Sequence, residues 1–222
     1  MISPGSNLGV EKSMFAVVFE VQLDRSYADE YLRTAAALRP HLLEVEGFIR
    51  NERFRSPTRP HALLSLSLWD NEKALVRWRS MAIHHHAQAK GRGGVFEDYH
   101  LRVAEVTRSS VRFGDRELGW MRRDSTEVGA RALTLIESSS RVDCLQSIAK
   151  ADGALSVETY EHLDDPQHTV TILSWPGLQQ ADEFFEDVMP TDQQLYSLRV
   201  IRDYGLKDRR EAPQFYPPRA GL

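Results

Sequence analysis

Two stretches of the 222-residue chain determine its organisation: Gly47–Trp69 reads GFIRNERFRSPTRPHALLSLSLW, and Gly153–Trp175 reads GALSVETYEHLDDPQHTVTILSW. They align without gaps at a constant offset of 106 residues, glycine with glycine and tryptophan with tryptophan. A second match, YHLRV at 99–103 with YSLRV at 196–200, has an offset of 97, so the second copy is nine residues shorter between these points. Chance similarity between amphipathic hairpins is the alternative, but two matches in the same order favour an internal duplication.

Each copy predicts the same order of elements. In the first copy we expect strands at 14–23, 48–55 and 96–106, and a return strand on which Leu64, Leu66 and Leu68 alternate. We also expect a helix at 27–45 that ends before Gly47, and a second helix that Asp70 or Asn71 caps and that runs to about residue 90. In the second copy we expect strands at 132–137 and 195–203, a hairpin at 155–175, and helices at 142–151 and 178–188. The order βαββαβ predicts an α+β fold of tandem ferredoxin-like units.

The first strand, MFAVVFEVQL, is largely apolar on both of its faces, so both faces must be covered. Helices cover one face of such a unit, and we expect the second copy's sheet to cover the other, giving a fold of the dimeric-α+β-barrel type. The predicted boundaries are a disordered N-terminus at 1–13, a first domain at 14–107, a linker at 108–130, a diverged second domain at 131–205 and a proline-containing tail at 206–222.

The composition of the chain argues against several classes of protein, among them nucleic-acid-binding and membrane-spanning proteins. The net charge is −4 and 41% of the residues are hydrophobic, which is typical of a globular protein and not of a basic nucleic-acid binder. No apolar run approaches the roughly 20 residues of a membrane helix. The single cysteine, Cys144, excludes an internal disulfide and is expected to be a small buried hydrophobe. We therefore expect a cytoplasmic protein with a small-molecule substrate and neither a nucleic-acid nor a membrane partner.

Several stretches of the first copy carry a resemblance to a known family. They are LSLSLW at 64–69, the pair Trp78-Arg79, His84, the pair Ala87-Gln88, and FEDYHLRV at 96–103. Over residues 14–107 the chain resembles the antibiotic biosynthesis monooxygenase family. The resemblance implies a monooxygenase or related oxidoreductase that acts with O₂, and without metal or flavin, on a small aromatic or polyketide-like substrate.

The run His84-His85-His86 is the most unusual local feature. On a regular helix, His85 and His86 would flank the apolar stripe and His84 would point away, whereas the family resemblance favours His84; a helix break near Ile83 would reconcile the two. We predict His84 or His85 as a general base, with a solvated helix end as the alternative. Consecutive histidines cannot share a helix face, so no metal site is predicted.

Glu20 is the third candidate catalytic residue, because a carboxylate in an apolar strand has its pKa raised if it is buried. Glu137 sits at the equivalent place in the second copy, and pairing with an arginine is the structural alternative. The haem-binding branch of the family would need an asparagine at Glu20 and an axial histidine at Gln88. We therefore expect no cofactor, although haem with another ligation stays open.

The expected substrate-binding residues are Trp69, Trp78, Phe19, Tyr99 and Arg102, whose rings and guanidinium could line a pocket inside the first copy's barrel face. Ordinary core packing of the tryptophans and a structural role for Arg102 are the alternatives. Two other function classes also remain: a non-catalytic ligand-binding or structural barrel, and a haem-binding barrel. A homodimer is expected because closed two-fold assemblies are the commonest soluble oligomers.

Overall fold

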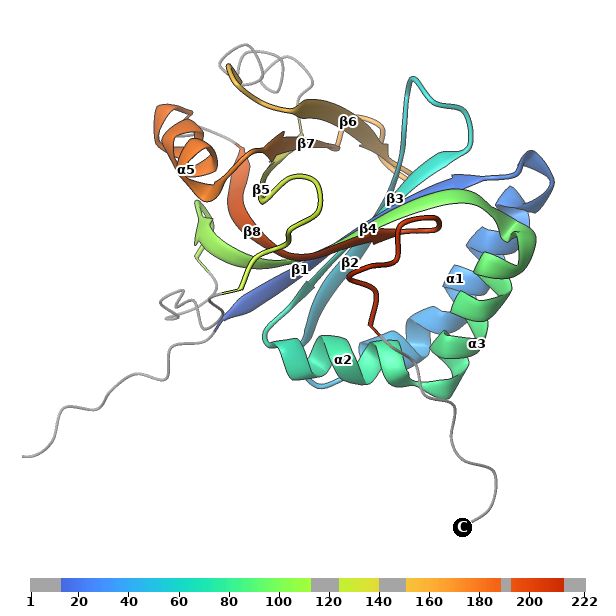
Figure 1. Ribbon diagram of the computed structural model, residues 1–222. Coiled ribbons are helices and arrows are strands. Elements are labelled where there is room, and N and C mark those ends of the chain that lie inside the picture. Colours follow the sequence, from blue (N-terminus) through green and yellow to red (C-terminus); the bar gives the residue numbers. More distant parts are fainter. Residues whose placement is uncertain (1–12, 113–123, 140–150, 189–192, 214–222) are drawn as a thin grey trace, which may run out of the picture.

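The computed structural model describes residues 13–112, 124–139, 151–188 and 193–213. Their strands form one closed barrel in which every paired neighbour is antiparallel, in the order β1-β3-β2-β6-β7-β5-β8-β4 (Figure 1). The strands are β1 Met14–Leu23, β2 Phe48–Arg55, β3 Ala62–Trp69, β4 Phe96–Ser109, β5 Ala132–Ser138, β6 Ser156–His162, β7 Thr169–Trp175 and β8 Gln194–Gly205.

The barrel divides into two halves of identical topology. The first half has the order β4-β1-β3-β2, and the second has the order β8-β5-β7-β6, which is the same arrangement of the corresponding strands. The predicted duplication and the closed α+β barrel are therefore confirmed. The halves are joined edge to edge by backbone hydrogen bonds, so one continuous sheet encloses the core.

The two seams between the halves differ in length. Strands β4 and β8 pair over nine residue positions, from His100 to Ser109 on β4, whereas β2 and β6 pair only at Phe54↔His162 and Arg55↔Glu161. Side chains reinforce the short seam, where Arg59 on the β2–β3 turn forms an ion pair with Glu158 on β6. Side-chain contacts therefore supplement the two-residue ladder on this side.

The barrel interior is a packed apolar core. The inward side chains of β1 and β3 alternate as the sequence predicted, with Ala16 and Val18 on β1 and Leu64, Leu66 and Leu68 on β3 buried at 2% exposure or less. They meet the corresponding side chains of the second half, among them Leu135, Tyr160, Ile172 and Leu198. Burial of this shared core is the main attraction between the halves, because apolar area removed from water stabilises in proportion to its size.

Helices cover the outside of both halves. Helices α1 Ala28–Leu43, α2 Glu72–Ser80 and α3 Ala82–Lys90 lie against the first half, and α5 Leu178–Asp187 lies against the second (Figure 1). Asn71 caps α2 as predicted, because its side chain accepts a hydrogen bond from the Ala74 N–H at 2.8 Å. Short helical turns at Arg25–Tyr27 and Gly91–Val95 precede α1 and follow α3.

The expected helix up to residue 90 is divided at Met81, close to the break near Ile83 that would reconcile the histidine positions. Met81 has extended backbone angles (φ −61°, ψ 132°), which end α2 and start α3 in a new direction. The Met81 N–H still donates to the carbonyl oxygens of Arg77 and Trp78, and its own carbonyl accepts from the His85 N–H at 2.8 Å. The break is thus hydrogen-bonded on both sides, and it reorients the histidine run that follows.

The repeat-equivalent glycines Gly47 and Gly153 offer a matched test of packing. Both have positive φ, +89° and +81°, but a Cβ at Gly47 would lie 2.8 Å from the Ala74 Cβ, whereas a Cβ at Gly153 would meet no described atom within 4 Å. We expect Gly153→Ala to cost about 1–2 kcal/mol of unfolding free energy from backbone strain alone. Gly47→Ala should cost about 1–3 kcal/mol more through overpacking. Urea unfolding of both variants measures the difference, and equal losses would contradict it.

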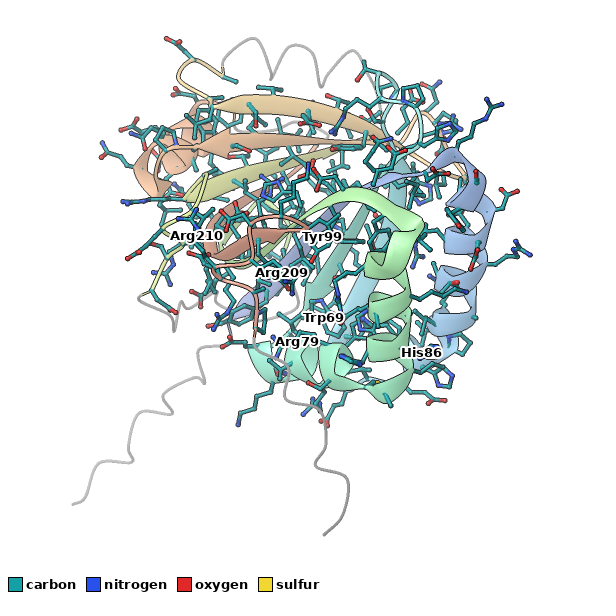
Figure 2. All side chains as sticks on the ribbon, turned by 45° about the vertical axis from the view of Figure 1, so that its right-hand side comes forward. Trp69, Arg79, His86, Tyr99, Arg209 and Arg210 are labelled. Atoms are coloured by element: carbon teal, nitrogen blue, oxygen red, sulfur yellow. The ribbon has the colours of Figure 1, made fainter. Side chains whose placement is uncertain are left out.

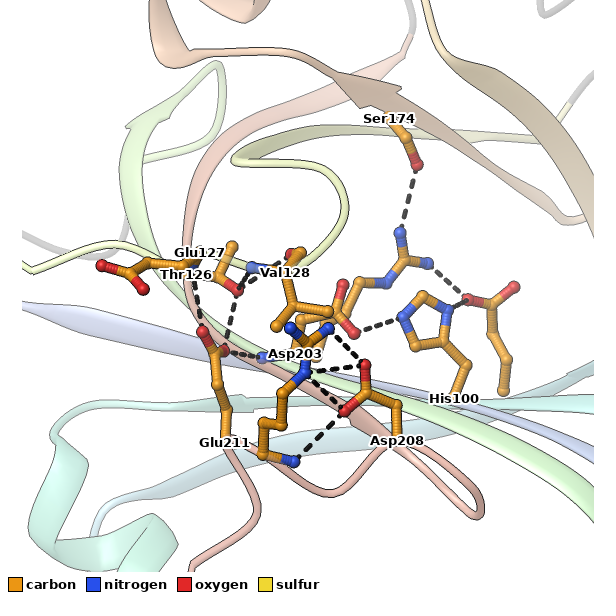
Figure 3. A network of polar contacts seen from close by, with 11 residues as sticks. His100, Thr126, Glu127, Val128, Ser174, Asp203, Asp208 and Glu211 are labelled. Carbon is orange, nitrogen blue, oxygen red and sulfur yellow. Dashed lines mark hydrogen bonds and ion pairs between the residues drawn. The ribbon is translucent and has the colours of Figure 1, made fainter.

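The chain after β8 crosses the barrel end and returns to the first half. Glu211 anchors this segment by accepting hydrogen bonds from the Thr126 hydroxyl and the Asp203 N–H, both at 2.7 Å, and from the Glu127 N–H (Figure 3). Burial acts to raise the pKa of Glu211, but these hydrogen bonds outweigh it and lower that pKa. The segment continues to Pro213, beside the helices of the first half.

Several sequence predictions lie outside the described residues. These are the disordered N-terminus, the expected helix at 142–151 with Cys144, part of the linker, and the end of the tail. Within the described residues, no helix combines the length and apolarity that crossing a bilayer requires.

Candidate functional site

A cavity of about 350 Å³ lies between the outer face of the first half's sheet and helices α1, α2 and α3. Its size falls in the usual range for small-molecule sites, about 300–1,000 Å³. This cavity lies on the helix side of the sheet and not inside the barrel face as expected, because inward-facing leucines, valines and tyrosines fill the middle of the barrel. A second hollow, lined by Glu20, Tyr99 and Arg102 among others, opens at one mouth of the barrel. Figure 2 shows Trp69 and Tyr99 on this side of the barrel, where the sheet faces the helices.

Small polar side chains make the floor of the cavity. Ser65 and Ser67 of β3 line it, and the Asn51 amide donates to the Ser65 hydroxyl at 2.9 Å. The Trp69 indole N–H donates to the Ser67 hydroxyl at 2.9 Å, which holds the ring at one end. In the second half the residue equivalent to Ser67 is Leu173. Small floor residues therefore leave space in the first half that a larger side chain occupies in the second.

The outer face of the second half is packed. Leu173 and Trp175 contact Phe184 and Phe185 of α5 in one buried cluster. The Trp175 and Phe184 rings lie 5.2 Å apart between centroids. The two halves have thus diverged on the faces that correspond by duplication.

His84 is the histidine that the helix break turns toward the cavity. Its ring stacks on Trp78 with centroids 4.3 Å apart and an interplanar angle of 17°. Its Nδ1 lies 3.0 Å from the Trp78 carbonyl oxygen, which can only accept, so Nδ1 carries the proton and Nε2 keeps a free lone pair. The helix break fixes both the position and the tautomer of this imidazole.

The surroundings of His84 keep it neutral. Its pKa is lowered to about 4, mainly by burial and to a smaller extent by nearby His85, while the hydrogen bond to the Trp78 carbonyl acts to raise it. His85 also lines the cavity, whereas His86 is exposed and is not among the lining residues (Figure 2). His84 is partly buried, stacks on Trp78 and has a defined tautomer.

Most of the residues predicted to bind substrate lie together in this cavity. Trp69, Trp78, Phe19 and Tyr99 all line it. Phe19 and Tyr99 pack with ring centroids 5.7 Å apart, and Phe96 joins them at 5.8 Å from Phe19. Their rings form an apolar, aromatic wall beside the polar floor, because Phe19 of β1 pairs with Ser65 of β3.

Glu20 and Arg102 lie elsewhere, on the inward face at one mouth of the barrel. They form an ion pair with each other, and their side chains are only 12% and 5% exposed. The Tyr160 hydroxyl of the second half also donates to Glu20, and burial followed by the Glu20 charge raises the pKa of Tyr160. His100 lies between Glu20, at 3.7 Å, and Asp203, at 2.6 Å (Figure 3). Glu20 is thus paired with an arginine, which was the structural alternative to a catalytic role.

A second buried carboxylate, Glu137, reaches across the barrel in a similar way. Arg50 of β2 binds it and also lies 2.9 Å from Glu52. With His168, these two glutamates form a group with metal-ligand spacing. The Arg50 guanidinium already supplies the positive charge between the carboxylates, so the arrangement is an ion-pair network that links the halves.

The sequence did not point to several charged residues of the cavity. Among the lining side chains, seven are arginine or lysine and two are glutamate, although the whole chain carries a net charge of −4. Arg53 and Tyr31 contribute from β2 and α1, and Arg202 and Arg209 from the C-terminal part of the chain. Strand alternation places Asn51 and Arg53 on the same face of β2, so the sequence could have indicated Arg53. The position of Arg209 beside the first half depends on contacts far away in the chain, and no local pattern predicts it.

Comparison with known proteins agrees with this architecture. Residues 14–90 match the family model described as antibiotic biosynthesis monooxygenase. A Pyricularia oryzae protein named jasmonate monooxygenase ABM is 42% identical over 92% of this chain and 99% of its own length. An uncharacterized Bacillus subtilis protein, YqjZ, is 32% identical over 46% of this chain and 86% of its own.

Among solved structures, an aldoxime dehydratase superposes with a TM-score of 0.57 at 9% identity, covering 94% of this chain and 91% of its own, which is a likeness of fold alone. The sequence relatives carry more weight, because one of them spans nearly the whole of both chains. The chain belongs to the antibiotic biosynthesis monooxygenase family.

Proposed function

We propose that the chain is a small-molecule monooxygenase whose reaction takes place in the cavity between the first half's sheet and α1, α2 and α3. The observation that carries the proposal is the position of His84, a partly buried neutral imidazole with a free Nε2 beside an aromatic wall. A general base needs such a lone pair, and a dry cavity around it strengthens the electrostatic interactions of the reacting groups.

The proposed substrate is a small, largely apolar carbonyl compound, and jasmonate is the probe that the Pyricularia oryzae relative suggests. Jasmonate combines a cyclopentanone ring, an apolar side chain and a carboxylate. The aromatic wall suits the carbon skeleton, and the excess of lining cations suits the negative charge. An aromatic polyketide-like substrate shares the required chemistry, an acidic proton next to a carbonyl group.

We propose that the reaction needs no metal or flavin. His84 would remove the proton beside the carbonyl, and the resulting enolate would reduce O₂. A methylene group then becomes a carbonyl, one oxygen atom enters the product, and the other leaves as water, so the substrate supplies all the electrons. The enolate would also be the counter-ion that raises the low pKa of His84 during the step.

Two residues argue against the haem chemistry of part of the family. Gln88, at the expected axial position, lines the cavity but offers only an amide. Glu20, at the position of the family's asparagine, pairs with Arg102 on the other face of the sheet. These residues therefore do not fit haem.

The test is turnover by chelator-treated protein whose visible spectrum is free of flavin and haem bands. We expect jasmonate, supplied with isotopically heavy O₂, to gain one heavy oxygen atom by mass spectrometry. Ser67→Leu is the matched control, because it places on the cavity floor the residue that the second half carries at the equivalent position. It should abolish product while the protein stays folded. Saturable binding without any product would instead favour the non-catalytic alternative.

We propose that the protein forms a homodimer, although one chain already closes its own barrel. A dimer would be built on outer surfaces and not on the seams that single-copy barrels need. Light scattering should give a particle of about twice 25.4 kDa. A particle of a single chain's mass at micromolar concentration would contradict the proposal.

A further inference from the structure

We propose that Arg53, together with Tyr31, binds a carboxylate of the substrate at the floor of the cavity. This inference rests on the proposed function and names the part of the substrate that the cationic lining selects. Arg53 belongs to β2 and Tyr31 to α1, so the two residues face each other from the sheet and from the helix layer.

The backbone of Arg53 is fixed on both sides. On one side it pairs with Ser65 of β3, and on the other its carbonyl accepts a hydrogen bond of 3.0 Å from the Leu163 N–H of the second half. Side chains two residues apart on a strand point to the same face, so Arg53 follows Asn51 toward the cavity. A guanidinium on such a rigid element is well placed for directional recognition.

The charge of Arg53 is not compensated within the described part of the chain. Its side chain is half-buried, its Nε is buried without a hydrogen-bond partner, and no described carboxylate forms an ion pair with it. Glu30, which also lines the cavity, already pairs with Lys90. A buried charge without a partner is costly, and an anionic ligand would remove that cost.

Tyr31 provides a second donor at the same place. Burial raises the pKa of its hydroxyl, while Arg53, which hydrogen-bonds to it, acts to lower that pKa. The hydroxyl therefore stays protonated at neutral pH. A planar guanidinium and a phenolic O–H together suit the two oxygens of a carboxylate.

The other cavity arginines are less suited to this role. Arg202 acts on Glu211, whose pKa it helps to lower. Arg209 donates a hydrogen bond to the Tyr99 hydroxyl, and its side chain is exposed (Figure 2). Arg39 and Arg92 are exposed as well, and the partly buried Arg79 lies near Tyr204, whose pKa it acts to lower. Arg53 is distinguished from these five arginines by an Nε that is buried without a hydrogen-bond partner.

The experiment compares binding of jasmonate and of its methyl ester by calorimetry at neutral pH. We expect the wild-type protein to bind the acid roughly tenfold to a hundredfold more tightly than the ester, as charge-assisted hydrogen bonds would give. Arg53→Gln should abolish this preference and leave binding of the ester unchanged, and Arg53→Lys should retain part of it. Arg55→Gln is the matched control, because Arg55 shares the strand but does not line the cavity.

The outcomes separate this inference from the proposed function. If both compounds bind equally, or if Arg53→Gln keeps the preference while Arg202→Gln loses it, the role of Arg53 is overturned and the cavity remains the binding site. If neither compound binds, the proposed substrate class fails and the carboxylate site fails with it. Melting temperatures of all variants show whether a lost preference comes from lost folding.

Discussion

Replacing His84 with alanine should lower turnover of the cavity's substrate about 100- to 10,000-fold, the usual contribution of a general base. Only the neutral Nε2 is in a position to take the proton, because Nδ1 is bound to the Trp78 carbonyl. The loss of stability should be modest, about 1 kcal/mol, since α3 lies at the surface and the neighbouring helix keeps its core contacts. Product formation and urea unfolding of the same preparation measure the two effects.

The matched control for His84 is His86→Ala, because His86 is exposed and is not among the cavity-lining residues. It should leave both turnover and stability unchanged. Equal activity of the His84 variant and the wild type would show that the histidine run is a helix end without a role in the reaction.

The pH dependence gives an independent check on His84. A base acts only when it is deprotonated, so activity should persist as the pH falls and disappear near pH 4, the lowered pKa of His84. An ordinary histidine would lose activity near pH 6.5. Methyl jasmonate is the suitable substrate for this measurement of kcat/KM, because it has no carboxyl group that titrates in the same range.

Replacing Glu20 with alanine should have the opposite pattern, a loss of about 3–5 kcal/mol of unfolding free energy with an unchanged turnover number at a temperature where the variant is folded. Without the Glu20 carboxylate, the charge of Arg102 would be buried and uncompensated, because the Arg102 side chain is only 5% exposed. The substitution would also remove one of the two acceptors of the Tyr160 hydroxyl, the one that joins the two halves. Urea denaturation measures the loss.

Glu158→Ala provides the comparison for Glu20. Glu158 also forms an ion pair, with Arg59, but its side chain is 41% exposed, and exposed pairs contribute about 0–1 kcal/mol. If Glu20→Ala instead abolished turnover without loss of stability, the original prediction of a catalytic Glu20 would hold and its structural role would be wrong.

The fold could be predicted from the sequence because the repeat encodes it twice. The alternation of Leu64, Leu66 and Leu68 identified the inward face of β3, and Gly47 marked the end of α1. Both signals are local, since side-chain period and backbone conformation depend on neighbours a few residues away. The second copy of the same pattern then predicted the sheet that completes the barrel.

The site could be predicted only in part. Aromatic residues near the histidine run marked the cavity, but β1 is apolar on both faces, so the sequence could not say which side of the sheet would be hollow. The break at Met81 depends on a single backbone torsion, and no residue type there demands it. The partners of Glu20 include Tyr160, 140 positions away in the chain, and no local pattern encodes such a contact.

The packing of Phe184 on α5 against Trp175 of the sheet has a consequence for how this protein can change. In a barrel assembled from two identical chains, every substitution occurs in both chains. A substitution that improves the cavity of one chain must therefore also be tolerated at the same position of the other chain. Here the two faces are encoded separately. Ser67 can remain small while Leu173 stays large, and one half can accept mutations that reshape the cavity while the other supplies a reserve of stability. After the duplication, substitutions that change substrate specificity in one half therefore need not occur in the other half.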